Sequence, residues 1–165
     1  MRYFLLLIPC LVAELVAIPA AFIVPIIEGI KPGLCKWFVT PDNPIYGDEG
    51  HQERTKDWPI YLSQVWWLLR NRAYGFKLYA IGCEFSETVE ALGNPNIKNR
   101  DNGVAGHCLW LSAAGWYWKS ITPIGHSYCL QLAFGWQLDA PINGRCLYMF
   151  SPRVTKFLGG NSGRP

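Results

Sequence analysis

The stretch YFLLLIPCLVAELVAIPAAFIVPII, from Tyr3 to Ile27, decides the class of this chain. Among its 25 residues the only charged side chain is that of Glu14. About 20 apolar residues are enough for a helix to cross the hydrocarbon core of a bilayer. We therefore expect a transmembrane helix within residues 1–30, kinked where its prolines remove backbone N–H donors.

A cleaved signal peptide is the alternative interpretation of the same segment. Met1 and Arg2 form a short basic start, and the small residues from Ala17 to Ala21 offer a cleavage site. The apolar run nevertheless continues to Ile27, which is longer than the apolar core of a signal peptide needs to be. A membrane anchor is thus the favoured prediction, and the signal peptide stays open beside it.

The composition excludes several classes of protein. Of the 165 residues 50% are hydrophobic and only 16% are charged, which argues against a disordered or solvating segment. A formal net charge of +3 gives no basic footprint for a nucleic acid. The sequence contains neither a GxxxxGK[ST] loop nor a GxGxxG turn after a strand, so no nucleotide and no other cofactor is expected.

Beyond the apolar segment we expect one folded domain. Residues 31–57 are rich in turn formers and predict a polar linker, residues 58–158 an α+β domain, and residues 159–165 a disordered tail. The segment from Trp58 to Asn71 is typical of an amphipathic helix that begins after an Asp57 cap.

Further along the chain the period of the pattern changes to two. From Cys129 to Leu138, apolar residues alternate with smaller or polar ones, which predicts a strand that buries Leu130, Leu132, Phe134 and Trp136 and turns Gln131 the other way. Other strands are expected at residues 76–81, 107–112, 116–120 and 145–150, with a turn at 141–144 and a loop at 93–106. The predicted fold is α+β: one N-terminal transmembrane helix, followed by a small antiparallel sheet with one packed amphipathic helix.

The six cysteines show no CxxC spacing, and one of them, Cys10, lies in the apolar run. Five remain outside it and cannot all pair, so we expect buried free thiols in a reducing compartment. Lys31 and Lys36 follow the apolar run and favour a cytoplasmic main domain.

Oxygen-bearing side chains gather between Thr40 and His51. Asp42, Asn43, Asp48 and Glu49 are candidate ligands of a Ca²⁺ ion, which prefers carboxylate and carbonyl oxygens. Their spacing does not match an EF-hand. We favour Asx turns, in which these side chains accept hydrogen bonds from nearby backbone N–H groups, and no metal.

Aromatic and basic side chains flank the predicted amphipathic helix. The candidate membrane-interface residues are Trp37, Trp58, Trp66, Trp67 and Arg70. Packing of this helix in a protein core is the competing interpretation, and it is the more common role of such a pattern.

No catalytic residue is predicted. His51, His107 and His126 are far apart, with no metal-ligand spacing between them. Ser127 follows His126, but chain neighbours rarely form a nucleophile and its base, and there is no GxSxG elbow. Glu84, Glu87 and Glu90 have the spacing of a solvated face.

Three blocks carry a resemblance to a known group: FVTPDNPIYGDEGH at Phe38–His51, WLLRNRAYGF at Trp67–Phe76 and GRCLYMFSPR at Gly144–Arg153. In this order they resemble the small, uncharacterised, membrane-anchored proteins of tailed phages and prophages of Gram-negative bacteria. The resemblance implies a phage origin and a place in the host inner membrane, and it brings no activity with it.

From these observations we expect a non-enzymatic accessory protein in the bilayer that works by contact with a host or phage protein. The alternatives are a structural component of the virion or of its assembly, and a membrane-bound hydrolase.

Overall fold

The chain divides at Gly82 into a helical unit, residues 1–82, and a sheet unit, residues 83–165. The structure is a computed structural model that describes residues 2–85, 88–100, 103–125 and 127–158. The predicted boundary at Trp58 is therefore misplaced, because the helix that follows it belongs to the helical unit. The predicted tail at 159–165 lies outside the described residues.

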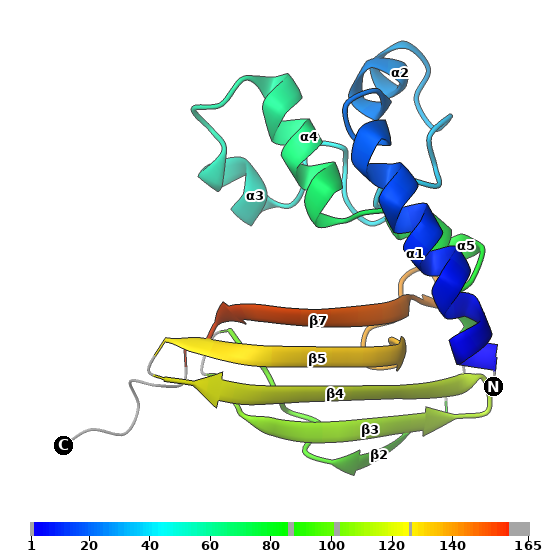
Figure 1. The fold of residues 1–165 in the computed structure, drawn as a ribbon, viewed down its shortest axis with the longest axis vertical. Coiled ribbons are helices and arrows are strands. Elements are labelled where there is room, and N and C mark those ends of the chain that lie inside the picture. Colours follow the sequence, from blue (N-terminus) through cyan, green and yellow to red (C-terminus); the bar gives the residue numbers. More distant parts are fainter. Residues whose placement is uncertain (1, 86–87, 101–102, 126, 159–165) are drawn as a thin grey trace. The chain divides into compact units, whose positions relative to one another are not determined.

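Five helices form the first unit (Figure 1): α1 (Arg2–Ala20), α2 (Val24–Ile30), α3 (Glu49–Arg54), α4 (Ile60–Arg70) and α5 (Tyr74–Tyr79). The long apolar run is divided between α1 and α2, which corrects the expectation of one helix through Ile27. Pro25 stands in the first turn of α2, where its missing N–H leaves no hydrogen bond unmade. Of the described helices, α1 alone is long and apolar enough to cross a membrane, with a mean hydropathy of 2.2.

The core of the helical unit lies where α4 meets α1 and α2. Its buried side chains are Ala21, Val24, Cys35, Val65 and Leu68. The hydroxyl of Tyr61, on α4, donates a hydrogen bond of 2.7 Å to the carbonyl oxygen of Phe22. The buried side chains of α4 thus pack against α1 and α2.

Residues 31–57 are more than a linker. Both carboxylate oxygens of Glu28 accept backbone hydrogen bonds, from Gly33 N at 2.8 Å and Cys35 N at 2.7 Å. Further on, Asp48 caps α3 by accepting a hydrogen bond of 2.6 Å from His51 N. The segment folds onto the helical unit through these side-chain acceptors, and His51 and Thr55 are buried within it.

The predicted strand at 76–81 is helical in the structure, where it forms most of α5. Phe76 N donates to the carbonyl oxygen of Trp37 at 2.8 Å. A Cβ at Gly75 would overlap the carbonyl oxygen of Lys36, so this close approach requires glycine. Six residues are too few for alternation to separate a strand from a helical turn.

Antiparallel strands make up the sheet unit. A five-stranded sheet has the order β2-β3-β4-β5-β7, and a two-stranded sheet pairs β1 with β6. The strands are β1 (Cys83–Glu84), β2 (Glu90–Gly93), β3 (Gly106–Ser112), β4 (Gly115–Ile124), β5 (Tyr128–Trp136), β6 (Arg145–Cys146) and β7 (Tyr148–Lys156). Figure 1 shows the larger sheet as successive antiparallel arrows.

The sheet confirms three of the predicted strands, those at 107–112, 116–120 and 129–138. The strand predicted at 145–150 is divided into β6 and β7, and β2 was not predicted. The turn at 141–144 is confirmed: Ile142 and Arg145 exchange backbone hydrogen bonds, and Asn143 and Gly144 have φ values of 51° and 72°.

The face of β5 that is buried is the opposite of the predicted one. Cys129 and Ala133 are fully buried, whereas Leu130 and Leu132 are half-buried. Gln131 is buried with them, and its Oε1 accepts a hydrogen bond of 3.2 Å from Arg153 Nη2. Small side chains on this face leave room for the large ring of Tyr117, which lies opposite Gly135. Trp136 is buried, as predicted.

Candidate functional site

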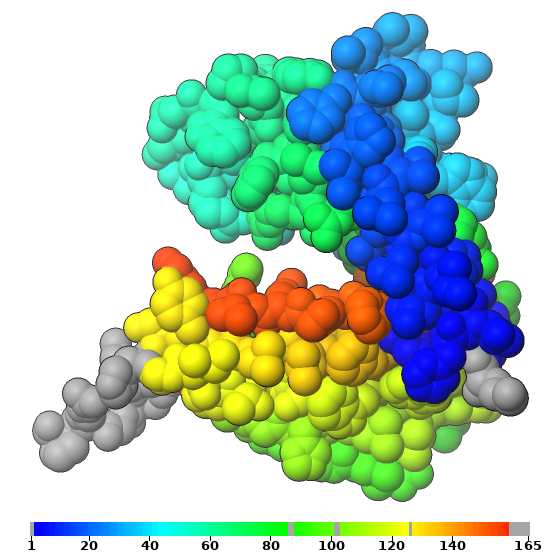
Figure 2. Space-filling view, viewed as in Figure 1, coloured from blue at the N-terminus to red at the C-terminus, as the bar shows by residue number. Residues whose placement is uncertain are grey.

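Most large apolar side chains of α1 are exposed. The atoms of α1 are among those drawn in blue in Figure 2. Only about 17% of this helix is buried. Its exposed large side chains are Phe4, Leu5, Ile8, Leu11, Val12, Leu15, Val16 and Ile18. A contiguous apolar surface of this kind marks a contact with lipid or with another protein.

The one acidic side chain of α1 is paired. Glu14 Oε1 lies 2.9 Å from Nζ of Lys77, on α5, and the two side chains are only 20% and 15% exposed. A carboxylate within an apolar helix is costly unless a partner and hydrogen bonds compensate for the lost water. The ion pair therefore neutralises the one charge that interrupts the apolar surface.

Four of the five predicted interface residues are exposed in the helical unit. Trp58 and Trp66 have ring centroids 6.5 Å apart, and Lys36 Nζ lies 4.9 Å from the ring centroid of Trp37. Trp67 is different: it is only 4% exposed, and the guanidinium of Arg70 lies over its ring. Trp67 is therefore a core residue, because its position on α4 turns it inward. We no longer count it among the candidate membrane-interface residues.

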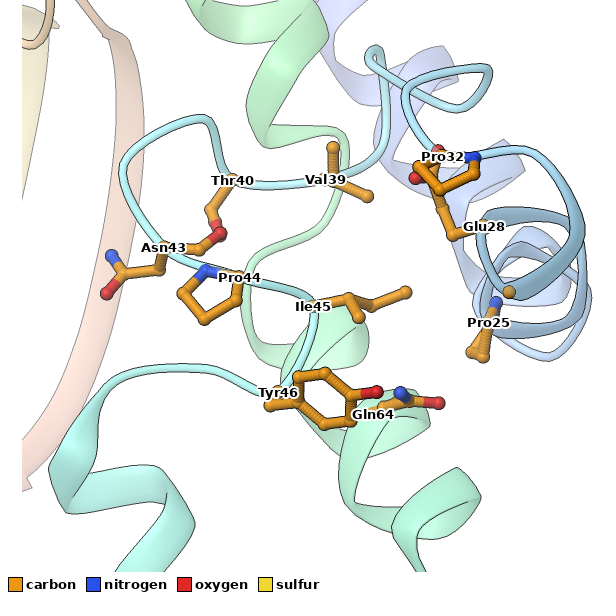
Figure 3. A pocket seen from close by; sticks show the side chains of 11 residues that line it. Pro25, Glu28, Pro32, Val39, Thr40, Asn43, Pro44, Ile45, Tyr46 and Gln64 are labelled. Carbon is orange, nitrogen blue, oxygen red and sulfur yellow. The ribbon is translucent and has the colours of Figure 1, made fainter.

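A pocket of about 380 Å³ opens between α2, the loop at 39–46 and α4 (Figure 3). Its wall combines prolines and aliphatic side chains with polar groups. The sequence analysis did not predict this pocket. The polar side chain that stands out is Gln64, which is 8% exposed and has its amide directed toward Pro25. The lining residues are Pro25, Glu28, Gly29, Pro32, Val39, Thr40, Asn43, Pro44, Ile45, Tyr46 and Gln64.

A buried polar cluster surrounds His51 in the helical unit. His51 Nε2 is 3.0 Å from the carbonyl oxygen of Ser63 and 3.1 Å from its hydroxyl, and Thr55 Oγ1 is 2.7 Å from the same hydroxyl. A carbonyl oxygen only accepts, so Nε2 carries the proton. His51 Nδ1 is then a buried acceptor without a partner. His51, Ser63 and Thr55 thus form one buried hydrogen-bonded cluster of the helical unit.

We expect the helical unit to lose stability as the pH falls below about 6.5. Burial lowers the pKa of His51, with smaller contributions from Arg70 and Arg54; the Ser63 carbonyl and Asp48 act in the opposite direction. The folded state then binds fewer protons than the unfolded state, so stability is complete above the unfolded pKa and falls as the pH drops toward the folded one. Denaturant melts between pH 8 and pH 5 measure this.

The control for this effect is His107, which is exposed on β3. His51→Gln keeps an N–H for Ser63 but does not titrate, and should flatten the pH dependence. His107→Gln should leave it unchanged. Equal pH dependence in His51→Gln and the unmodified chain would contradict this role of His51.

Two of the candidate calcium ligands make hydrogen bonds to nearby residues of the same segment. Asp48 is the cap of α3, as the Asx interpretation predicts. Asn43 contributes its carbonyl oxygen to a hydrogen bond from Thr40 Oγ1 at 3.2 Å, and Asp42 and Glu49 are exposed. Within the ranges that the structure describes, no three His, Cys, Asp or Glu side chains gather as a metal site.

The remaining candidates for chemistry are dispersed over the sheet unit. The ring of His107 makes no hydrogen bond in the part of the chain that the structure describes, and Ser127 is exposed. Glu84 lies opposite Arg145, and Glu90 lies on β2. His126 and Glu87 are outside the described residues.

An aromatic row crosses one face of the large sheet. Leu109, Trp118, Phe134 and Phe150 lie opposite one another on β3, β4, β5 and β7, and all are half-buried. Trp118 and Phe134 stack with centroids 5.8 Å apart and an angle of 6°. The alternating pattern of β5 singled out Phe134 but not Trp118 or Phe150, its partners on the neighbouring strands. The sequence of one strand does not show which residues of other strands lie opposite it.

Comparison with protein families gives a match over most of the chain. A model described as a family of unknown function, DUF7338, matches residues 1–157. The chain belongs to this family. The matched residues include the segments that form the apolar helix, the pocket and both sheets. Neither curated proteins nor solved structures gave a match.

Proposed function

We propose that the chain is a membrane-anchored, non-enzymatic accessory protein that works by contact with other proteins. The observation that carries the proposal is α1, which is 19 residues long and leaves most of its apolar side chains exposed. Water around such a surface would be unfavourable by about 25 cal/mol for each Å² of apolar area, whereas lipid tails cover it without that cost.

The polar features of the helical unit are compatible with a bilayer around α1. Glu14 is paired with Lys77, which reduces the cost of an ionisable group at membrane depth. Trp37, Trp58 and Trp66 remain exposed, and tryptophan is enriched where lipid meets water.

Contact with a protein partner is supported by the aromatic row on the sheet. Trp118, Phe134 and Phe150 form a continuous half-exposed strip. Aromatic side chains are enriched at the centres of protein interfaces because they bury much area with few rotatable bonds. The partner is a host or phage protein, and the phage origin and the host inner membrane rest on the resemblance of the three blocks alone. The lysines that follow α2 favour a cytoplasmic sheet unit.

Cysteine labelling tests the anchor in open membrane fragments. Ile8 on α1 and Val154 on β7 are 71% and 64% exposed, so by exposure alone a cysteine at either position should react equally with a water-soluble maleimide. We expect Ile8→Cys to react about tenfold more slowly than Val154→Cys, because lipid excludes the reagent and water. The unsubstituted chain, whose six cysteines are all buried, gives the background.

After denaturation in a strong detergent the two variants should react equally. Equal rates in the intact fragments would place α1 in water and would contradict the anchor.

A further inference from the structure

Two of the buried cysteines lie directly opposite each other. Cys83 on β1 and Cys146 on β6 are register partners in the two-stranded sheet, beside the pair of Glu84 and Arg145. Opposite residues of an antiparallel ladder have Cα atoms about 4.5–5.5 Å apart. A disulfide spans Cα separations of about 4.4–6.8 Å, so this position accepts one without movement of the strands.

The two thiols already interact. Both side chains are buried, with Cys83 6% and Cys146 0% exposed, and burial and the neighbouring Cys83 raise the pKa of Cys146. The cysteines of the five-stranded sheet lack this arrangement: Cys108 lies opposite Gly93 and Lys119, and Cys129 lies opposite Pro123 and Thr155. All six cysteines are buried and none is in a disulfide, as the sequence predicts. Cys83 and Cys146 are the pair that is placed to react.

We propose that Cys83 and Cys146 are an oxidation site, which a small-molecule disulfide or a thiol oxidase converts into a cross-strand disulfide. One thiolate attacks the reagent disulfide, forms a mixed disulfide and releases one reagent thiol. The second protein thiolate attacks the protein sulfur of that mixed disulfide and releases the other reagent thiol. Two protein thiols lose two protons and two electrons, and one reagent disulfide becomes two thiols.

Oxidation of this pair is slow, but the disulfide that forms stabilises the sheet unit. Burial and the neighbouring Cys83 raise the pKa of Cys146 to about 12, so the attacking thiolate is scarce at neutral pH and forms when the short β1–β6 ladder opens. Once formed, the bond closes the long loop that contains β2 to β5 and restricts the unfolded state. The disulfide would fix β1, the first strand after the boundary between the two units. This inference does not depend on the membrane anchor.

Oxidised glutathione tests the site in the full-length, detergent-solubilised chain. After equilibration, alkylation of the remaining thiols and peptide mapping, we expect one linked pair of peptides, containing Cys83 and Cys146, and a mass lower by about two daltons before alkylation. The thermal midpoint of the sheet unit should rise by on the order of 10 °C, and a reducing agent should reverse the rise.

Variants separate this pair from general thiol oxidation. Cys129→Ser should keep the linked peptides, whereas Cys146→Ser should lose them and leave Cys83 free or carrying glutathione. If folded, unsubstituted chain retains Cys83 and Cys146 as thiols or as glutathione adducts, the proposal is wrong. Linked peptides that appear only when the chain is oxidised in urea would equally overturn it.

Discussion

Replacement of Trp136 by alanine is expected to lower the free energy of unfolding of the sheet unit by about 3–5 kcal/mol. Trp136 is 3% exposed and packs edge-on against Tyr148, with ring centroids 6.0 Å apart and an angle of 81°. A Cβ at Gly115 would lie 2.7 Å from the same ring, so the indole fills the space that this glycine leaves. Truncation removes the transfer free energy of the ring and leaves a cavity.

Denaturant unfolding followed by near-ultraviolet circular dichroism measures this loss. The matched control is Tyr128→Ala in the same strand, where the ring is 51% exposed and the expected change is within about 0.5 kcal/mol. Similar losses in both variants would show that the indole of Trp136 has no special place in the core.

The second large effect is expected for Lys77→Ala, which should destabilise the helical unit by about 3 kcal/mol or more. The substitution leaves the carboxylate of Glu14 without its partner at a site where its side chain is only 20% exposed. Loss of one member of a buried ion pair costs more than loss of both, because an unpaired charge stays behind. Far-ultraviolet circular dichroism of the solubilised chain during heating measures the change.

Two further variants isolate the role of charge at this pair. Lys77→Arg keeps the ion pair and should lose little stability. The double variant Glu14→Gln with Lys77→Met removes both charges and should recover much of the stability that Lys77→Ala loses. If the double variant is as unstable as Lys77→Ala, packing of the lysine stem, and not charge, accounts for the effect.

Elements with a long or strict pattern could be predicted from the sequence. The apolar length of α1 and the alternation in β5 each exceed what chance spacing gives, and both elements are present. The turn at Asn143 and Gly144 followed from residues that accept a positive φ. The hydrogen bond from a nearby backbone N–H to Asp48 followed from the Asx pattern, but the helix α3 that Asp48 caps was not predicted.

What failed depended on contacts between distant residues. The buried face of β5 contains Gln131 because Arg153, on the neighbouring strand, satisfies its amide. The His51 cluster depends on Ser63, and the neutralisation of Glu14 depends on Lys77, 63 positions away. Neither partner is marked by a local pattern. The apolar face of α4 was detected, but a pattern on one helix does not say whether helices or a sheet will cover it.

Insertion of α1 into a bilayer is the central claim, and an alkaline carbonate wash of membranes from cells that produce the chain tests it most directly. The N-terminus of the recovered product is determined in the same experiment, because a cleaved leader would also begin with an apolar helix. We expect the full-length chain, with α1 intact, to remain in the membrane pellet. Release of the full-length chain into the supernatant, or a product whose N-terminus lies near Ala20, would contradict the account.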